Sequence, residues 1–464
     1  MKLRTVLILL LLIVALIYGA SWFLTSKEKD LSPESLAWLQ APEESTLSPA
    51  RNAHYYLLGF RAPAASDPVT LGQEISNVNH QRMAEGDFTA SFSNQLVDTP
   101  FLAYNGDLLL LDMDVIANAD FIEQARERNA LLLERYETLL AYTSFEPGKD
   151  NLCIVHDTED LLACRNLYLV SAKLKAAQGQ GVQAIEDVAR DSAFWRMATA
   201  QSNMFLFKIL GKDTALTDMV VVVDILGQHP ELAHDTRAME LIMDITAPAS
   251  PEELDWTPVY VQRFRDFVSI AASPPPYENF GEFEELRDKA FSSSLIYSAL
   301  KPLYSPEATI NDLQKLFACR AQASTLPPAE LESAFAACEQ GLAENSAWSL
   351  DSLTNPLGRR LLLLASDNYL GHLKEFHMRY TVVPRIVRVW AKALAADIRE
   401  EGFQDYLNGL PLEEQDPFTH APFHYETLQQ AVYGSDVIVP ITWPDPDLTP
   451  DTPDDPDQAE TPQQ

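Results

Sequence analysis

Two short patterns place a serine at a spacing that could support acyl transfer. Ser298 precedes Lys301 by three positions, and a Ser-Asp-Asn triplet begins at Ser366. In enzymes with this chemistry a serine attacks a carbonyl, a lysine helps to remove the serine proton, and a Lys-Thr-Gly strand completes the site. No Lys-Thr-Gly follows the triplet, which lies in a leucine-rich run with helical spacing. We therefore predict no catalytic residues.

Histidines and carboxylates at close spacing could bind a metal ion. His372 and His377 are five residues apart, so they do not share one helix face, and Pro422 interrupts a second histidine pair. An Asp-Met-Asp run that begins at Asp112 would need further oxygen ligands from elsewhere in the chain. No phosphate-binding or dinucleotide-binding glycine loop occurs. We predict no metal site and no cofactor.

The four cysteines form two local pairs that could be disulfides. Cys153 and Cys164 flank one polar turn, and Cys319 and Cys338 flank a proline-containing turn, each between helical patterns. Each disulfide would join two arms of a hairpin and stabilise it by about 3 kcal/mol. Free buried thiols are the main alternative, because no spacing typical of a zinc site occurs. Since disulfides persist in oxidising compartments, two of them would place most of the chain in the periplasm or a similar lumen.

An aromatic segment near the end of the chain, DPFTHAPFHY over residues 416–425, could dock a peptide or a glycan. The possible interaction surface consists of Asp416, Pro417, Phe418, Pro422, Phe423 and Tyr425. Burial of this segment against the preceding helix is the alternative.

The longest apolar run lies at the start of the chain. Lys2 and Arg4 precede an uncharged stretch over residues 5–24, which as a helix would span the roughly 30 Å of a bilayer. We predict an uncleaved transmembrane anchor, because the run exceeds the about 7–15 residues of a signal-peptide core and no small-residue cleavage site closes it. A cleaved signal peptide and a buried soluble helix are the alternatives. Together with the cysteines, the anchor predicts a single-pass inner-membrane protein with its bulk in the periplasm.

The rest of the sequence is dominated by helical patterns. From about residue 120 apolar residues recur at helical spacing, and Gly179–Gly181 separates two patterns in an order that looks like a tetratricopeptide hairpin. No clean 34-residue period is present. We predict a mainly α fold in which a transmembrane helix precedes a repeat-like, tetratricopeptide-like helical array. A Tyr-Asn-Gly-Asp turn over 104–107 predicts one small β-hairpin, and Pro384 should kink or divide the last long helix.

Proline clusters and changes in composition divide the chain into segments. They are a cytoplasmic N-terminal region (1–4), the anchor (5–24), a polar stalk (25–52), a first helical half (53–245), a Pro-rich connection (246–280), a second helical half (281–442) and a disordered tail (443–464) that has seven acids and no base.

Composition limits the classes of function. The chain has 464 residues, 47% of them hydrophobic, which is enough for a sizeable core. Its formal net charge of −33 repels polyanions, so we exclude a general nucleic-acid role.

Several segments together resemble an uncharacterised proteobacterial family of single-span, membrane-anchored helical proteins. They are RNAHYYLLGFRAPAASDP (51–68), the cysteine pair at 153 and 164, DSAFWRMATAQSNMFLFK (191–208), SPEATINDL (305–313) and TNPLGRRLL (354–362). The resemblance implies topology and fold, and it implies no activity. We expect Phe194, Trp195 and Arg196 within it to be packing residues.

The helical array and the lack of a catalytic constellation favour a non-enzymatic envelope scaffold that binds other proteins. A periplasmic hydrolase of cell-wall or glycan material is the alternative, and it would need a deep pocket with a titratable group of shifted pKa. A carrier of lipid or another apolar ligand, with a cavity between helices, is a third hypothesis.

Overall fold

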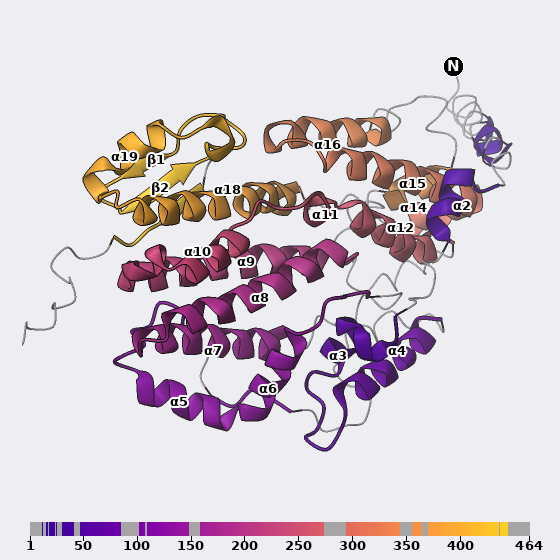
Figure 1. Ribbon diagram of the computed structural model, residues 1–464. Coiled ribbons are helices and arrows are strands. Elements are labelled where there is room, and N and C mark those ends of the chain that lie inside the picture. The colour runs from indigo at the N-terminus through magenta and orange to yellow at the C-terminus, as the bar shows by residue number, and fades with distance from the viewer. Residues whose placement is uncertain are drawn as a thin grey trace, which may run out of the picture.

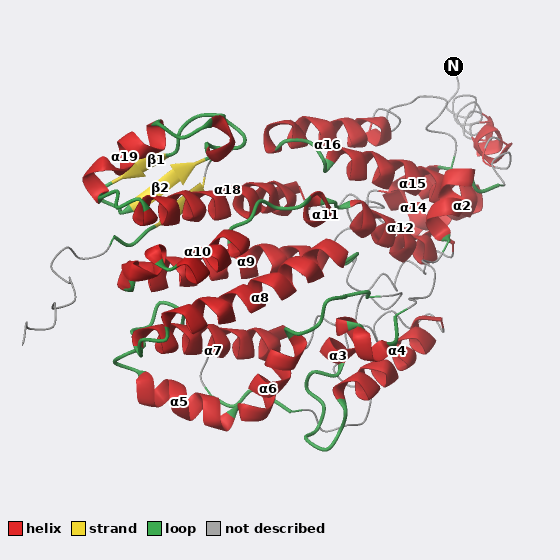
Figure 2. Cartoon of the chain, viewed as in Figure 1, coloured by secondary structure: helices red, strands yellow, loops and turns green. Residues whose placement is uncertain are grey.

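The structure is a computed structural model that describes most of the chain in separate stretches. They are residues 30–40, 47–84, 102–106, 109–147, 158–272, 294–343, 355–362, 365, 370–435 and 437–443, with residues 12, 15–16, 18–23 and 25 near the N-terminus. Within these stretches the chain is mainly helical and forms one small sheet (Figure 2), so the prediction of a mainly α fold is confirmed.

The helices between residues 53 and 245 pack in layers around a first core. Figure 1 shows α5 and α6 at one edge, followed by α7, α8 and α9, with α10 beside α8. Buried Ala184, Val188, Trp195 and Ala198 recur at helical spacing along α8, which explains its central place between α7 and α9. The helices are α3 (Ala53–Leu58), α4 (Pro68–Ala84), α5 (Ala119–Arg128), α6 (Ala130–Leu139), α7 (Thr158–Ala177), α8 (Gly181–Gln201), α9 (Phe205–Gln228) and α10 (Thr236–Ile245), with 3-10 turns η1 (Pro49–Arg51) and η4 (Pro230–His234).

A second core gathers helices from both sides of the predicted Pro-rich connection. Trp256, Phe264, Phe317 and Phe376 are among its buried side chains. Its elements are α2 (Pro33–Leu39), α11 (Pro251–Leu254), α12 (Thr257–Ala272), α14 (Ser294–Leu300), η7 (Lys301–Leu303), α15 (Pro306–Ala323), α16 (Pro328–Ala343) and α17 (Pro356–Leu362). Helix α2, which packs on α12 and α15, lies inside the segment predicted to be a polar stalk.

Helix α18 (Leu370–Ala395) joins the two cores. Its residues up to Tyr380 are buried in the second core, and its residues from Val382 onward are buried in the first. Pro384 lies inside this helix, which is not divided there as the sequence suggested it could be. Helix α19 (Glu400–Asn408) buries Phe403 and Leu407 in the first core, and the 3-10 turn η11 (Leu412–Glu414) follows it.

The sheet lies near the C-terminus and is antiparallel, with strand order β1 (His424–Glu426), β2 (Ala431–Gly434), β3 (Val437–Pro440). Tyr425 pairs with Val432, and Val432 pairs with Val439. The prediction of a hairpin at 104–107 is wrong for the described residues there, 104–106, which are not strand. The backbone N–H of Tyr104 donates to Asp160 Oδ1 at 2.8 Å, and that of Asn105 to Asn129 Oδ1 at 2.7 Å. Side chains that are distant in the sequence thus accept the hydrogen bonds that these two backbone N–H groups would donate to a neighbouring strand in a hairpin.

The N-terminal prediction requires a correction. Across the part of the chain that the structure describes, no helix combines the length and the apolar character that crossing a membrane demands. Most of residues 5–24 lie outside the described residues. Thr25, just beyond this run, is buried against the helical body, where its Oγ1 accepts a hydrogen bond from the backbone N–H of Asn355 at 2.9 Å. The expected transmembrane helix is therefore not found.

The two cysteine pairs differ. Cys319 and Cys338 form a disulfide between α15 and α16, with a Cα–Cα distance of 5.7 Å, as predicted. Cys164 is instead a free thiol, buried on α7, while Cys153 lies outside the described residues. The predicted Cys153–Cys164 disulfide is therefore not found, since Cys164 is free and is buried in the first core.

Candidate functional site

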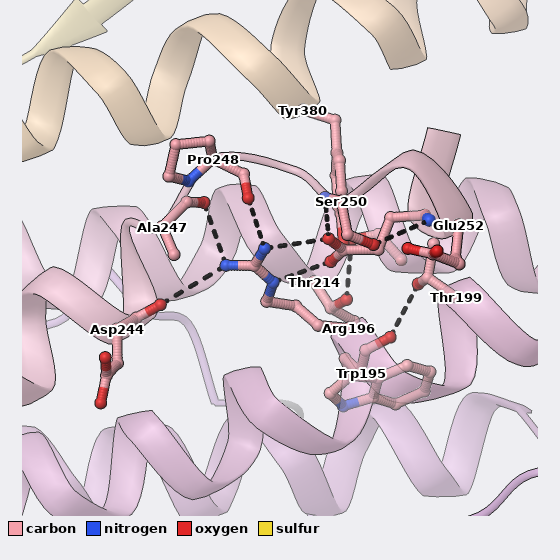
Figure 3. A network of polar contacts seen from close by, with 12 residues as sticks. Trp195, Arg196, Thr199, Thr214, Asp244, Ala247, Pro248, Ser250, Glu252 and Tyr380 are labelled. Carbon is pink, nitrogen blue, oxygen red and sulfur yellow. Dashed lines mark hydrogen bonds and ion pairs between the residues drawn. The ribbon is translucent and has the colours of Figure 1, made fainter. Parts of the chain in front are cut away.

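An ion pair between α8 and α11, formed by the half-buried Arg196 and the buried Glu253, is the centre of a polar network beside a cavity (Figure 3). Arg196 Nε lies 2.7 Å from Glu253 Oε1, and Arg196 Nη2 lies 2.9 Å from Glu253 Oε2. This two-point geometry is the strong form of an arginine–carboxylate contact. The guanidinium also donates to the carbonyls of Ala247 and Pro248, each at 3.0 Å, and so fixes the segment that leads into α11.

The carboxylate of Glu253 has partners on every side. Tyr380 Oη on α18 donates to Glu253 Oε1 at 2.8 Å, and the backbone N–H of Ser250 donates to Glu253 Oε2 at 2.5 Å. Ser250 Oγ accepts from the backbone N–H of Glu253, which completes a capping box at the start of α11. Burial raises the pKa of Glu253, but the hydrogen bond and charge of Arg196 outweigh burial, and the pKa lies below its usual value.

Lys208 on α9 donates hydrogen bonds that hold α11 in place. Its Nζ donates to the carbonyls of Glu252 at 3.2 Å and Glu253 at 3.0 Å, and its side chain is fully buried. Burial lowers the pKa of Lys208 to about 8. Because α11 has only four residues, these contacts rather than helix propensity hold it in place.

The face of α11 opposite these contacts lines a cavity of about 680 Å³, here named the α11–α18 cavity. Its walls come from α11, from the turn between α15 and α16, from α18 and from the loop before β1. The lining is rich in proline and apolar side chains and also includes two carboxylates and two histidines. The residues are Pro251, Glu252, Leu254, Asp255, Thr325, Leu326, Pro327, Pro328, His377, Thr381, Pro417, Phe418 and His420.

The predicted interaction segment contributes part of this wall. Pro417 and Phe418 line the α11–α18 cavity, whereas Asp416 and Pro422 line a neighbouring recess of about 510 Å³ beside the sheet. Phe423 and Tyr425 are buried in the first core, as the alternative of burial anticipated. The structure therefore divides the six predicted residues between a cavity wall and the packing beneath it.

Asp416 organises the turn that carries Pro417 and Phe418. Its Oδ1 accepts from the backbone N–H groups of Phe418 at 2.9 Å and Thr419 at 3.1 Å, and from Ser435 Oγ at 2.6 Å. The side chain is 2% exposed, so these bonds satisfy a buried charge. Asp416 thus supports the cavity wall and does not itself face a ligand there.

The cavity brings together two histidines that are far apart in the sequence. His377 is buried, with Nε2 2.9 Å from the carbonyl of Ser324, whereas His420 is exposed. Burial lowers the pKa of His377, so it is neutral at neutral pH. Within the described stretches of the chain, no group of three or more His, Cys, Asp or Glu residues could hold a metal ion.

The other candidate residues do not converge on this cavity. Ser298 and Lys301 are exposed on α14 and η7, and the triplet at 366–368 lies outside the described residues. Asp114 Oδ1 accepts from the backbone N–H groups of Ile116 and Ala117, each at 3.0 Å, so it caps a turn. Phe194 and Trp195 are buried packing residues, as expected, but Arg196 belongs to the polar network.

Sequence reasoning missed Arg196, Glu253 and Lys208. The run Ser250-Pro251-Glu252-Glu253 has the spacing of a capping box, and this signal could have located the start of α11. No local pattern links Glu253 to Arg196, which lies 57 residues earlier.

Comparisons with known proteins give no relative: no family model, no curated protein and no solved structure matches the chain. The resemblance to the proteobacterial family of single-span proteins therefore stays a prediction.

Proposed function

We propose that this protein is a non-enzymatic interaction protein that binds a cationic, apolar segment of a partner protein in the α11–α18 cavity. The observation that carries the proposal is the composition of the cavity wall. Prolines and Phe418 offer rigid apolar surface, while Glu252 and Asp255 supply negative charge beside it.

Charge complementarity supports a basic partner. The chain has a formal net charge of −33, so a positively charged segment is attracted from a distance as well as at contact. The exposed side chain of Glu252 has no partner among the described residues, so a lysine or arginine could approach it without breaking an existing ion pair.

Rigidity also supports the proposal. Arg196, Lys208 and Tyr380 hold α11 in place, and Asp416 holds the turn that carries Phe418. The Cys319–Cys338 disulfide joins α15 to α16, the helices on either side of the turn that lines the cavity. A preformed wall lowers the ordering cost of binding. The disulfide supports an oxidising compartment, and we propose the periplasm or a similar lumen as the location.

A panel of three labelled 12-residue peptides tests the proposal by fluorescence anisotropy. One peptide alternates lysine with leucine, the second glutamate with leucine, and the third lysine with serine. We expect saturable binding of the lysine–leucine peptide only, weakened at least about fivefold by Phe418→Ala, because this change removes the aromatic wall. Leu428→Ala is the matched control, because Leu428 is 95% exposed and lies outside the cavity. Equal binding of all three peptides, or no effect of Phe418→Ala, would contradict the proposal.

A further inference from the structure

A second cavity lies between α7 and α9 and shares no lining residue with the α11–α18 cavity. Its volume is about 630 Å³, within the range of about 300–1,000 Å³ typical of small-ligand sites. Leu162 and Leu210 supply apolar walls, and its polar lining includes Glu159, Arg165 and Asp213. We name it the α7–α9 cavity.

Arg165 reaches this cavity from a buried network. Its Nε donates to Asp191 Oδ2 at 2.8 Å, and its Nη2 donates to Asp218 Oδ1 at 2.5 Å and to the carbonyl of Thr214 at 2.9 Å. The side chain is only 2% exposed. The third nitrogen, Nη1, donates to none of the residues that the structure describes. Since Arg165 lines the cavity and its other nitrogens are occupied, Nη1 is the atom that a ligand could reach.

Most charges around this cavity already have partners. Asp160 pairs with Arg61 at 2.9 Å, and Asp213 pairs with Lys212 at 3.2 Å. Within the buried network, Arg165 pairs with both Asp191 and Asp218, and burial, reinforced by Asp191, raises the pKa of Asp218 well above its usual value. Glu159 has no ion-pair partner within the described part of the chain. The cavity thus combines a guanidinium nitrogen that has no acceptor among the described residues, Arg165 Nη1, with a carboxylate that has no ion-pair partner among them, that of Glu159.

We propose that the α7–α9 cavity binds a short zwitterionic peptide, whose carboxylate accepts from Arg165 Nη1 and whose ammonium pairs with Glu159. The two leucines would contact its side chains. The observed volume leaves room for more than one residue. This site is independent of the proposed partner-binding function, because the two cavities have separate walls.

Isothermal titration calorimetry of the full chain with trialanine tests the proposal. N-acetyl-trialanine lacks the ammonium, and trialanine amide lacks the carboxylate. We expect trialanine to bind saturably and each blocked peptide to bind about tenfold more weakly, which is the scale of one charge-assisted hydrogen bond.

Two variants link binding to the cavity without changing the buried network. Glu159→Gln should weaken the binding of trialanine about as much as acetylation of the peptide does. It should leave the binding of N-acetyl-trialanine unchanged. Thr217→Phe should block all three peptides, because Thr217 lines the cavity and its hydroxyl bonds only to the Asp213 carbonyl of its own helix. Glu240→Gln on α10 is the control, and circular dichroism checks that each variant is folded. No saturable trialanine binding, or binding insensitive to Thr217→Phe, would overturn the proposal.

Discussion

Tyr380 Oη donates a hydrogen bond of 2.8 Å to Oε1 of Glu253, and this contact joins α18 to α11 across 127 positions of sequence. Tyr380 is also the last residue of α18 buried in the second core before the helix enters the first. The same carboxylate pairs with Arg196 on α8. Glu253 therefore connects α11, which lines the α11–α18 cavity, to a helix of the first core through Arg196 and to the second core through Tyr380.

Removing the charge of Glu253 should destabilise the fold strongly. Glu253→Gln leaves Arg196 without its ion pair in a largely buried place, and breaking such pairs costs about 3 kcal/mol or more. Urea denaturation followed by circular dichroism measures the change in the free energy of unfolding. Glu252→Gln is the matched control, because this exposed neighbour should change stability by less than about 0.5 kcal/mol. Equal effects of the two variants would show that the Arg196–Glu253 ion pair does not contribute to the free energy of unfolding.

The depressed pKa of Glu253 predicts a pH dependence. The usual glutamate value is 4.5, and the folded state holds the pKa of Glu253 below it. Its contribution to stability is therefore present above about pH 4.5 and is lost as the pH falls through the folded-state pKa. The difference in unfolding free energy between the wild type and Glu253→Gln should shrink below pH 4.5. A difference that stays constant down to pH 3 would contradict this assignment.

Lys208 predicts a second rise in stability, at alkaline pH. Burial lowers its pKa from 10.5 to about 8, so between these values the unfolded chain binds more protons than the folded chain. Stability from this group should therefore rise as the pH increases from 8 to 10.5, by up to about 3 kcal/mol. The comparison is between the wild type and Lys208→Met, whose stability should lack this rise. Parallel pH profiles for the two proteins would show that Lys208 titrates normally.

Close approach of two helices makes Gly72 sensitive to substitution. A Cβ added at Gly72 would lie 1.8 Å from the carbonyl oxygen of Tyr55, and this backbone atom cannot rotate away. We expect Gly72→Ala to destabilise the protein by about 1–3 kcal/mol. Gly371→Ala serves as the control, because nothing lies within 4 Å and alanine there should raise helix stability by about 0.5–1 kcal/mol. Thermal denaturation should give shifts of opposite sign, and a stable Gly72→Ala variant would contradict the packing of α3 on α4.

The thiol of Cys164 should be unreactive in the folded protein. Burial raises its pKa to about 12, so almost no thiolate is present at neutral pH. Iodoacetamide should modify Cys164 in urea but not in buffer, as read by peptide mass spectrometry without reducing agent. The bridged pair Cys319 and Cys338 should resist the reagent under both conditions. Rapid modification of Cys164 in buffer would show that α7 is not packed as described.

Local patterns in the sequence predicted much of the helical architecture. Gly179–Gly181 indicated a break between two helices, and α7 ends at Ala177 while α8 begins at Gly181. The proline-containing turn between Cys319 and Cys338 indicated a helical hairpin, and the disulfide forms there. These predictions succeeded because caps and short loop closures depend on residues close in sequence.

The predictions that failed depend on distant residues. The turn at Tyr104 does not make a hairpin, because Asp160 takes its backbone donor. Arg196 was assigned to packing because Glu253, its partner, has no recognisable spacing from it. The α11–α18 cavity could not be predicted for the same reason, since its walls come from four separate segments.

Charge reversal at the cavity edge tests the central claim most directly. Glu252→Lys places a cation where the basic partner segment should bind, and the exposed side chain lies outside the Arg196–Glu253 pair. Glu240→Lys makes the same change in net charge on α10, away from the cavity. In anisotropy titrations with the lysine–leucine peptide, we expect Glu252→Lys to weaken binding about tenfold and Glu240→Lys to change it by less than about twofold. Equal effects of the two reversals would show that the chain attracts basic peptides through its overall charge alone and would contradict binding in the cavity.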